Sequence, residues 1–401
     1  MAQARIIFVA FSSARRRVPA DGPFPPEAIV REPAGPNQAL RTPPRRARIM
    51  VTNARKARSV KTDEHREAML QEPGEGGKLR CKLCGHRCVI APDQLGICRV
   101  RQNVGGRLVT LSYDALVAIN VDPIEKKPLF HFLPGSMSLS VAAAGCNFQC
   151  SFCQNWQISQ APRTGRIVGG RPVAPERLVA EAEDHRCASI SYTYTEPTVF
   201  FELAYDTGKL ARAKGIRNCF VSNGYMTPEA VETAKDFLDA INVDLKAFRD
   251  ETYRKVMKAR LQPVLTCLKA LVAAGTWVEV TTLVVPGMND SEGELGDIAG
   301  FIAGELGPDV PWHVSRFHAD YEWDGETSTP LATLAKAVEI GRSAGLKFVY
   351  SGNVPGDANE STLCPSCGTM LIQRTGYSIR ENRIADGRCP GCGEAVAGIW
   401  T

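Results

Sequence analysis

Short apolar runs alternate with amphipathic stretches from about residue 138 onward. Seven runs rich in β-branched and aromatic residues have the length of strands: 138–144, 188–194, 217–222, 240–245, 277–285, 312–317 and 347–351. Stretches with apolar residues at three- and four-residue spacing lie between them: 175–185, 199–215, 228–239, 263–275 and 331–345. Repeated strand-helix units of this length predict a parallel sheet, either open and doubly wound or closed into a full or partial barrel. In either arrangement the functional site is expected at the carboxyl ends of the strands.

The rest of the chain has other patterns. Residues 1–62 are rich in Pro and Arg without helical or alternating periodicity, which predicts a disordered extension, although an Arg-rich, acid-poor leader also resembles an organellar transit peptide. Residues 63–115 form a predicted N-terminal Cys-rich module, and 116–360 contain the strand-helix core. A small separate module is predicted at 361–401.

Charge excludes some partners. The net charge is +5, but residues 1–62 carry 13 Lys and Arg against 3 Asp and Glu, so the remainder is mildly acidic. This remainder lacks the basic stripe that nucleic-acid backbones require, and a nucleic-acid partner is not favoured. No apolar run approaches the roughly 18 residues of a membrane span, so no membrane partner is expected. Clustered CxxC spacings in a chain of 401 residues indicate metal ligands in a reducing compartment, which predicts a cytoplasmic protein.

Three cysteines follow the first strand of the alternating region. Cys146, Cys150 and Cys153 lie in GCNFQCSFCQNW, a CxxxCxxC loop. Three thiolates can each bind one iron of a cubane [4Fe-4S] cluster, and because the loop has no fourth thiolate, one iron stays open for a ligand. A structural zinc site or buried core cysteines are the alternatives, but zinc prefers four ligands and paired CxxC knuckles.

This loop resembles the signature of radical S-adenosylmethionine (SAM) enzymes, and residues 138–351 resemble the activating enzymes of glycyl-radical enzymes such as pyruvate formate-lyase. More closely, the run from Cys81 through DPIEKKPLFHFLPGS at 122–136 to the C-terminal CPxCG pair is similar to the AmmeMemoRadiSam system radical SAM enzyme. The resemblance covers about residues 66–401. It implies an α/β fold with a partial (β/α)6 barrel of the radical SAM type, flanked by an N-terminal Cys-rich module and a C-terminal zinc-ribbon-like module.

The same resemblance implies an enzyme that binds SAM at the open iron, cleaves it reductively and forms a 5′-deoxyadenosyl radical for hydrogen abstraction from an unknown substrate. It also implies a flavodoxin- or ferredoxin-like electron donor and association with Memo-like and AMMECR-like proteins. A narrower alternative is a glycyl-radical-enzyme activase. An alternative of another class, suggested by the zinc-ribbon-like tail, is a metal-stabilised protein that binds nucleic acid or modifies RNA.

Residues that the resemblance assigns to SAM lie at successive strand ends. In SYTYTEPT, Thr195 and Glu196 take the last two places of the Gly-Gly-Glu turn of related enzymes, and the Glu196 carboxylate suits the SAM amino group. The next strand ends in VSNG, which offers Ser222 and Asn223 to the SAM carboxylate or ribose. Taken singly, such residues also have structural interpretations, since Asn-Gly is above all a turn signal.

Later strand ends complete this set. VDLK offers Asp244 and Lys246 as a charge pair, because residues two apart on a strand share a face. SRFHAD places His318 where the family has a histidine near the adenosyl group, although a lone histidine is more often a hydrogen-bonded core residue. One departure is Thr281, which stands where activases often have an arginine, so carboxylate recognition is expected to differ.

Two further cysteine sets flank the core. The C-terminal set forms two CPxCG knuckles, which predict a tetrahedral site for structural zinc, or for iron as in rubredoxin: Cys364, Cys367, Cys389 and Cys392. The N-terminal set, with His86 among it, fits zinc and an iron-sulfur cluster equally well, and thiols without metal are the alternative: Cys81, Cys84, Cys88 and Cys98. The three remaining cysteines are predicted to be small core residues: Cys187, Cys219 and Cys267.

A polar segment precedes the central loop and contains several functional groups: Asp122, Glu125, Lys126, Lys127 and His131. It is compatible with a substrate entrance and equally with a solvated linker, so no site is assigned to it. No catalytic residue is assigned either.

Overall fold

The computed structural model describes residues 65–113, 115–165, 170–325, 328–354 and 356–401. These residues belong to one compact unit, Ala57–Thr401. The predicted disordered extension at 1–62 lies outside the described residues. Within the described ranges, no helix is both long enough and apolar enough to cross a membrane.

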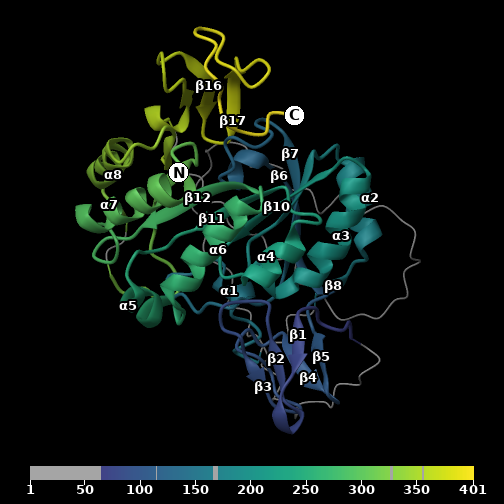
Figure 1. Ribbon diagram of the computed structural model, residues 1–401. Coiled ribbons are helices and arrows are strands. Elements are labelled where there is room, and N and C mark those ends of the chain that lie inside the picture. The colour runs from purple at the N-terminus through teal and green to yellow at the C-terminus, as the bar shows by residue number, and fades with distance from the viewer. Residues whose placement is uncertain (1–64, 114, 166–169, 326–327, 355) are drawn as a thin grey trace, which may run out of the picture. The chain divides into compact units, whose positions relative to one another are not determined.

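A nine-stranded sheet with the order β14-β13-β12-β11-β10-β9-β7-β6-β8 forms the centre of this unit (Figure 1). Seven neighbouring strands are parallel: β7 (Met137–Ala143), β9 (Ser189–Tyr192), β10 (Arg217–Ser222), β11 (Ala240–Asp244), β12 (Trp277–Val284), β13 (Trp312–Arg316) and β14 (Val349–Gly352). Two antiparallel strands, β6 (Ala115–Pro123) and β8 (Arg171–Pro172), extend the sheet beyond β7. All seven predicted strand runs are therefore confirmed.

Six helices connect the parallel strands: α2 (Pro175–Asp184), α3 (Phe201–Ala213), α4 (Pro228–Ala234), α6 (Leu261–Ala273), α7 (Glu292–Phe301) and α8 (Leu331–Ser343). The six strand-helix units confirm the predicted partial (β/α)6 barrel. Shorter turns of helix occur in the connections: η4 (Ile124–Lys126), α1 (Trp156–Ser159), η5 (Pro197–Phe200), α5 (Asp250–Thr252), η6 (Tyr253–Met257) and η7 (Ile302–Leu306). Helix α7 is not among the predicted stretches. It begins at Ser291, whose hydroxyl accepts a hydrogen bond from the Glu294 backbone N–H.

The polar segment after β6 is buried against the strands, so its interpretation as a solvated linker is wrong. The fully buried Glu279 of β12 accepts hydrogen bonds from the backbone N–H groups of Phe130 (2.9 Å) and His131 (2.8 Å). The Trp277 indole N–H (3.1 Å) and His313 Nε2 (2.7 Å) complete its shell. A buried carboxylate with four donors holds this segment in place, because each lost partner would remove one of the two hydrogen bonds that stabilise a buried charged oxygen.

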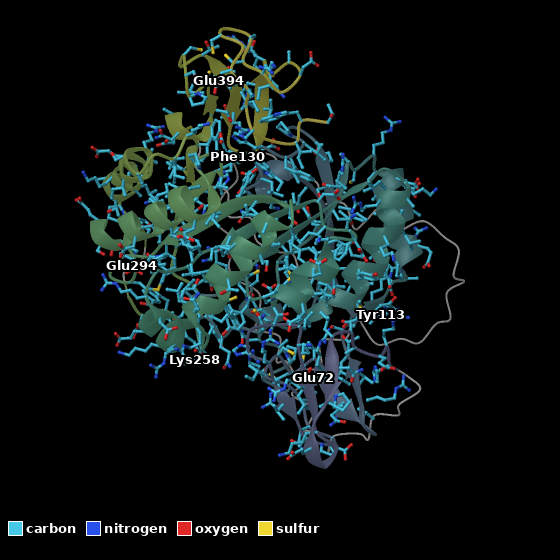
Figure 2. The ribbon with its side chains drawn as sticks, in the orientation of Figure 1. Glu72, Tyr113, Phe130, Lys258, Glu294 and Glu394 are labelled. Atoms are coloured by element: carbon cyan, nitrogen blue, oxygen red, sulfur yellow. The ribbon has the colours of Figure 1, made fainter. Side chains whose placement is uncertain are left out.

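Two smaller sets of strands flank the sheet. Before it come the sheet β1 (Gln71–Pro73), β2 (Leu79–Cys81) and β3 (Val89–Ile90), the turn η3 (Glu75–Gly77) and the hairpin β4 (Arg101–Val104) and β5 (Arg107–Thr110). After it come the turn η8 (Ala358–Glu360) and the sheet β15 (Thr362–Leu363), β16 (Met370–Thr375) and β17 (Ser378–Asn382). The Arg374 guanidinium of β16 donates to the Phe130 carbonyl at 2.8 Å, and Phe130 is labelled in Figure 2. The C-terminal strands are thus anchored to the polar segment.

Candidate functional site

The central cysteine loop begins directly after β7. Gly145 has a φ of +115°, and a Cβ at this position would lie 3.0 Å from a Val100 methyl group, so glycine is required here. Backbone hydrogen bonds fix the loop at two points, from Gly145 N to the Ile158 carbonyl and from Gln149 N to the Met257 carbonyl, both 3.0 Å long. The loop is therefore held in place by neighbouring segments.

The three thiols of this loop are partly or fully buried. Cys146 Sγ accepts hydrogen bonds from the Phe148 backbone N–H at 3.3 Å and from Asn223 Nδ2 at 3.8 Å. The Ser159 hydroxyl lies 3.3 Å from Cys153 Sγ. Burial raises the pKa of the Cys150 thiol to about 12, so a bound cation would be needed to hold it as a thiolate.

The number of thiols in this loop fits a cubane cluster. In a cubane each of three thiolates can bind a different iron. A tetrahedral structural zinc would need a fourth ligand, and the loop contains no fourth cysteine.

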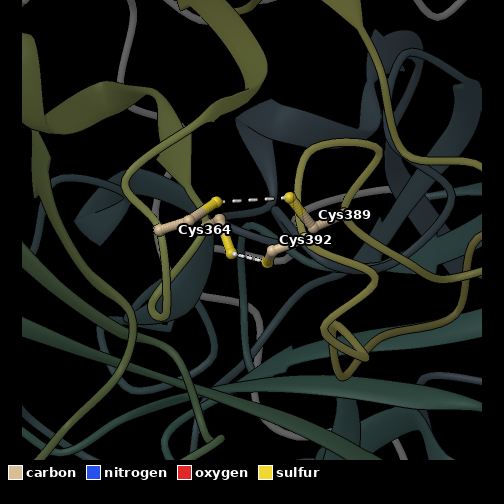
Figure 3. Close-up of side chains that lie close together, drawn as sticks. Cys364, Cys389 and Cys392 are labelled. Carbon is tan, nitrogen blue, oxygen red and sulfur yellow. Dashed lines mark hydrogen bonds between the residues drawn. The ribbon is translucent and has the colours of Figure 1, made fainter.

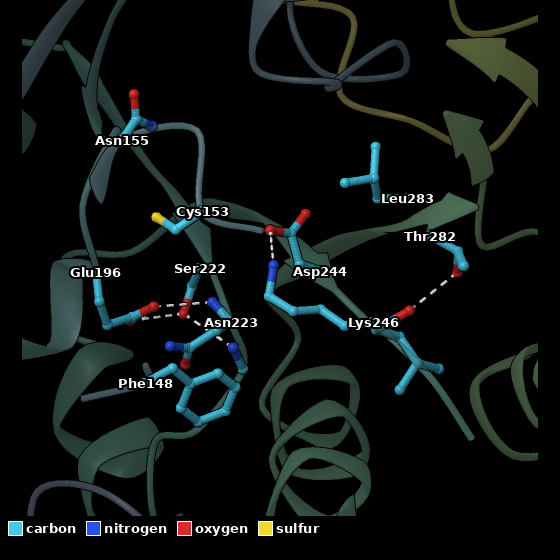
Figure 4. Close-up of polar contacts among 12 residues, drawn as sticks. Phe148, Cys153, Asn155, Glu196, Ser222, Asn223, Asp244, Lys246, Thr282 and Leu283 are labelled. Atoms are coloured by element: carbon cyan, nitrogen blue, oxygen red, sulfur yellow. Dashed lines mark hydrogen bonds and ion pairs between the residues drawn. The ribbon is translucent and has the colours of Figure 1, made fainter. Parts of the chain in front are cut away.

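Glu196 lies at the carboxyl end of β9, beside the cysteine loop (Figure 4). Its carboxylate is buried and accepts from the Ser222 hydroxyl and the Asn223 backbone N–H, both at 2.8 Å. The Thr198 backbone N–H and hydroxyl also donate to it, at 3.1 and 2.5 Å. Burial raises the pKa of Glu196, although these hydrogen bonds oppose that rise. The predicted residues Glu196, Ser222 and Asn223 therefore form one hydrogen-bonded group.

Asp244 and Lys246 form a second group at the end of β11. Lys246 Nζ donates to Asp244 Oδ2 at 2.7 Å, as Figure 4 shows, and lies 6.0 Å from the ring centre of Phe152 in the cysteine loop. Burial alone would lower the pKa of Lys246, but the Asp244 carboxylate outweighs burial and holds that pKa above its usual range. The predicted charge pair is thus present beside the loop.

The remaining predicted contact, His318, is not brought into either group. Its side chain is exposed after β13, and only its backbone pairs with Ser328 in a β-bridge. Two buried polar atoms near the strand ends have no hydrogen-bond partner among the described residues, Asn223 Oδ1 and Thr281 Oγ1. Such unpaired atoms beside Glu196 and Asp244 fit a polar ligand, and SAM carries an amine, a carboxylate, a ribose and an adenine.

Two residues in or beside the cysteine loop were not predicted from the sequence. Asn147 Oδ1 accepts from Asn223 Nδ2 at 2.7 Å and so joins the loop to β10. Tyr194 has a φ of +62°, a conformation rarely found for a bulky residue, and its carbonyl accepts from Asn155 Nδ2 at 2.7 Å. The position of Asn147 directly after Cys146 was an available signal. For Tyr194 the resemblance to a Gly-Gly-Glu turn marked the position, but no residue pattern indicated its conformation.

A third missed residue holds the ends of β11 and β12 together. Asn289 Nδ2 donates to the carbonyls of Lys246 (2.7 Å) and Leu283 (2.9 Å). Its Oδ1 accepts from the Val285 backbone N–H at 2.7 Å. The motif PGMND, in which an Asn follows a Gly turn, was a signal for such a backbone-bonding role.

The C-terminal cysteines have the geometry of a single-ion site. Their sulfurs all lie within 4.8 Å of one another: Cys364, Cys367, Cys389 and Cys392. Two sulfur pairs shown in Figure 3, Cys364 with Cys392 and Cys367 with Cys389, are 3.6 and 3.7 Å apart. These separations match the roughly 3.8 Å edge of a tetrahedral zinc-thiolate site. Hydrogen bonds from Thr369 lower the pKa of Cys367 to about 6, which favours the thiolate that a metal binds.

The N-terminal cysteines line one cavity together with Arg101, Asn147 and several apolar side chains: Cys81, Cys84, Cys88 and Cys98. The three cysteines outside the clusters are all buried, as predicted: Cys187, Cys219 and Cys267.

A partial (β/α)6 barrel with three cysteines after its first parallel strand defines an enzyme of the radical SAM class. The sequence profile of the Radical SAM superfamily matches residues 141–298, and the chain belongs to that superfamily, whose members use a [4Fe-4S] cluster and SAM. The chain is 43% identical over 333 residues to "Uncharacterized protein MJ0808" of Methanocaldococcus jannaschii, a match that covers 82% of this chain and 98% of that protein.

More distant similarities extend to proteins with assigned activities. The chain is 24% identical over 164 residues to the "Pyruvate formate-lyase-activating enzyme" of Clostridium pasteurianum, covering 39% of this chain and 66% of that enzyme. A solved radical SAM methyltransferase from Sphaerobacter thermophilus is similar with a TM-score of 0.41 and 16% identity, over 59% of this chain and 71% of the other.

Proposed function

We propose that this enzyme cleaves SAM reductively at the loop of Cys146, Cys150 and Cys153 and generates a 5′-deoxyadenosyl radical that abstracts a hydrogen atom from a substrate. The observation that carries the proposal is the buried Glu196 carboxylate beside Cys146. It accepts hydrogen bonds from Ser222 and Asn223 at the carboxyl end of β10. When bound, the cluster supplies one electron and an open iron, and SAM supplies the sulfonium bond that breaks.

The residues of this chain then have separate roles. The three thiolates hold the cluster, and Glu196 accepts a hydrogen bond from the SAM amino group. Asn223 offers its unpaired Oδ1, and Ser222 fixes the Glu196 carboxylate from the other side. The Asp244–Lys246 pair lines the SAM site from β11. The exposed His318 is given no role in this site.

A glycyl-radical-enzyme activase is the second candidate. The similarity to an enzyme named for pyruvate formate-lyase activation supports it, although that match covers only 39% of this chain. In that case the substrate is a backbone glycine of a partner protein, and the two proteins would form a stable complex. Hydrogen transfer from that glycine to 5′-deoxyadenosine would distinguish an activase from an enzyme that acts on a small molecule.

The C-terminal cysteines, the partner proteins and the cellular location complete the proposal. The C-terminal cysteines hold structural zinc, supported by the sulfur separations of 3.6 and 3.7 Å. A flavodoxin- or ferredoxin-like protein supplies the electron, and Memo-like and AMMECR-like proteins are proposed partners within an AmmeMemoRadiSam system. The clustered CxxC spacings, which are typical of metal ligands in a reducing compartment, support a cytoplasmic location.

The test is anaerobic. The wild-type chain and a Cys150→Ala variant are reconstituted with iron and sulfide, and EPR spectra of the reduced proteins are recorded with and without SAM. We expect a reduced-cluster signal that shifts on addition of SAM, with release of 5′-deoxyadenosine, and we expect both to be lost in the variant. Cys187→Ala is the matched control, because Cys187 is buried and lies outside the cysteine clusters. A wild-type protein without any SAM-responsive iron signal would refute the proposal.

A further inference from the structure

The N-terminal cysteines lie on one cavity whose remaining lining is mostly apolar. Leu83, Ile90, Ile97 and Val199 are among the side chains around it. Apolar surroundings exclude water and suit an iron-sulfur cluster, whose properties depend on solvent exposure. We infer that Cys81, Cys84, Cys88 and Cys98 hold a polynuclear iron-sulfur cluster, a second metal centre apart from the three-cysteine loop.

The two outer cysteine sets differ in their surroundings. The C-terminal sulfurs all lie within 4.8 Å of one another, as around a single tetrahedral ion, and Cys367 and Cys392 are exposed. The N-terminal thiols are buried or half-buried, and they line one cavity with the apolar side chains named above. Four thiols shielded from solvent in this way suit a polynuclear cluster.

Two buried donors without partners supply an independent argument. Arg101 is 1% exposed and Asn147 is 1% exposed, and both line the cavity. Arg101 Nε and Asn147 Nδ2 have no hydrogen-bond partner among the described residues. Buried N–H groups are almost always hydrogen-bonded, and the sulfides and thiolates of a cluster are acceptors that would satisfy both. Another nitrogen of Arg101, Nη1, already donates to Cys81 Sγ at 3.6 Å.

The cavity also adjoins the central loop. His86, between two of the N-terminal cysteines, has its Nε2 2.9 Å from the Asn147 carbonyl oxygen. On the other side, the Arg163 guanidinium donates to the Ile97 carbonyl, next to Cys98, and to the Cys146 carbonyl at 2.7 Å. The N-terminal site is therefore attached to the radical SAM loop at two points, which would place a second cluster beside the first.

The experiment removes the central site so that the inferred one is observed alone. The full chain carrying Cys146→Ser, Cys150→Ser and Cys153→Ser is reconstituted anaerobically, and iron, acid-labile sulfide and zinc are measured together with a Mössbauer spectrum. We expect about four iron and about four sulfide per chain to remain. Adding Cys84→Ser and Cys98→Ser should remove this iron and sulfide, while adding Cys187→Ser instead should leave them. Any zinc at the C-terminal cysteines is present in all variants, so it does not contribute to the difference in metal content between them.

One zinc, or one iron without sulfide, bound through the N-terminal cysteines would overturn the inference, and so would the absence of any metal there. Because the triple variant lacks the central thiolates, its iron content does not depend on the proposed SAM chemistry. A failure of the proposed function in the wild-type chain is thus distinguishable from a failure of this inference. The spectrum of the triple variant decides the question even if the variant with five substitutions does not fold.

Discussion

At the scale of single residues, Gly224 connects the end of β10, where we propose that SAM binds, to the next helix. Its φ is +68°, and a Cβ would lie 2.5 Å from a Val243 methyl group, which is closer than real Cβ contacts. We predict that Gly224→Ala lowers the free energy of unfolding by about 2–4 kcal/mol, the sum of a left-handed alanine and a core clash. It should also weaken SAM binding, because Val243 directly precedes Asp244. Urea denaturation and equilibrium SAM binding measure the two effects.

Gly275, between α6 and β12, is the matched control. Its φ is +79°, but a Cβ there would meet nothing within 4 Å. Gly275→Ala therefore has only the conformational cost, about 1–2 kcal/mol. Equal destabilisation by the two substitutions would show that the Val243 contact is unimportant.

Tyr194 illustrates what residue patterns could not predict. Its Oη donates to Asp122 Oδ2 at 2.5 Å, and Lys127 Nζ lies 4.8 Å from its ring centre. These contacts stabilise a left-handed backbone that tyrosine rarely adopts. They come from a segment 67 or more positions earlier, so no local pattern around Tyr194 contains them. The resemblance to a Gly-Gly-Glu turn located the position but not the residue's conformation.

At the scale of elements, the polar segment after β6 is predicted to make stability depend on pH. Burial lowers the pKa of His131 to about 4, while the nearby Glu279 opposes this shift. Since an unfolded histidine titrates near 6.5, the unfolded chain binds more protons between about pH 6.5 and 4. The His131 contribution is therefore fully present above about pH 6.5, and about 3 kcal/mol of stability is lost as the pH falls to about 4.

Denaturation of the wild-type chain and of His131→Gln across this pH window measures the effect. The variant should be less stable at pH 7, since Tyr350 Oη and the Ala397 carbonyl lose their partner, but its stability should fall less steeply with acid. His318→Gln is the control, because His318 is exposed. Parallel pH curves for wild type and His131→Gln would contradict the prediction, because other titrating groups are shared by both chains.

The C-terminal knuckles supply a second prediction at this scale. We expect Cys389→Ala to lose one zinc per chain and to expose the β15–β17 sheet to proteolysis, because a small metal module folds only with its metal. We expect treatment of the wild-type chain with a strong chelator to remove the same zinc and to expose the same sheet to proteolysis. Metal analysis and limited proteolysis measure both, with Cys267→Ala as control. Retention of zinc in Cys389→Ala would disprove the assignment of this site.

A strand or helix could be predicted from the sequence where its residue pattern reflects how the element is buried in the fold. The parallel strands are largely buried, so stretches rich in β-branched and aromatic residues such as 277–285 mark them clearly. Helix α7 was missed because Gly293, Gly296 and Gly300 weaken its helical pattern, and the helix depends on packing that only the fold provides. The burial of the polar segment was not predictable from its own residues, because the backbone groups of Phe130 and His131 are hydrogen-bonded by Glu279 and Arg374, which are distant in sequence.

At the scale of the whole molecule, one buried ion pair attaches the N-terminal strands to the barrel. Arg101 of β4 donates to Glu202 of α3, and both side chains are at most 2% exposed. Glu202 Oε1 also accepts from the Met69 backbone N–H at 2.8 Å. We predict that Glu202→Gln lowers the free energy of unfolding by about 3–5 kcal/mol, because it breaks a buried ion pair by removing the charge of one partner. Urea denaturation of the metal-loaded chain measures this loss.

A more exposed ion pair to the same helix, α3, provides the matched comparison. Arg66 and Asp206 are 3.0 Å apart with side chains 54% and 26% exposed, so Arg66→Met should cost only about 0–1 kcal/mol. Replacing both buried partners, as Arg101→Met with Glu202→Met, should recover part of the loss, because no isolated charge then remains in the interior. If Glu202→Gln proved no more damaging than Arg66→Met, the attachment of the N-terminal strands would have to rest on their apolar contacts and on two hydrogen bonds. These join His86 to the Asn147 carbonyl and Arg163 to the Ile97 carbonyl.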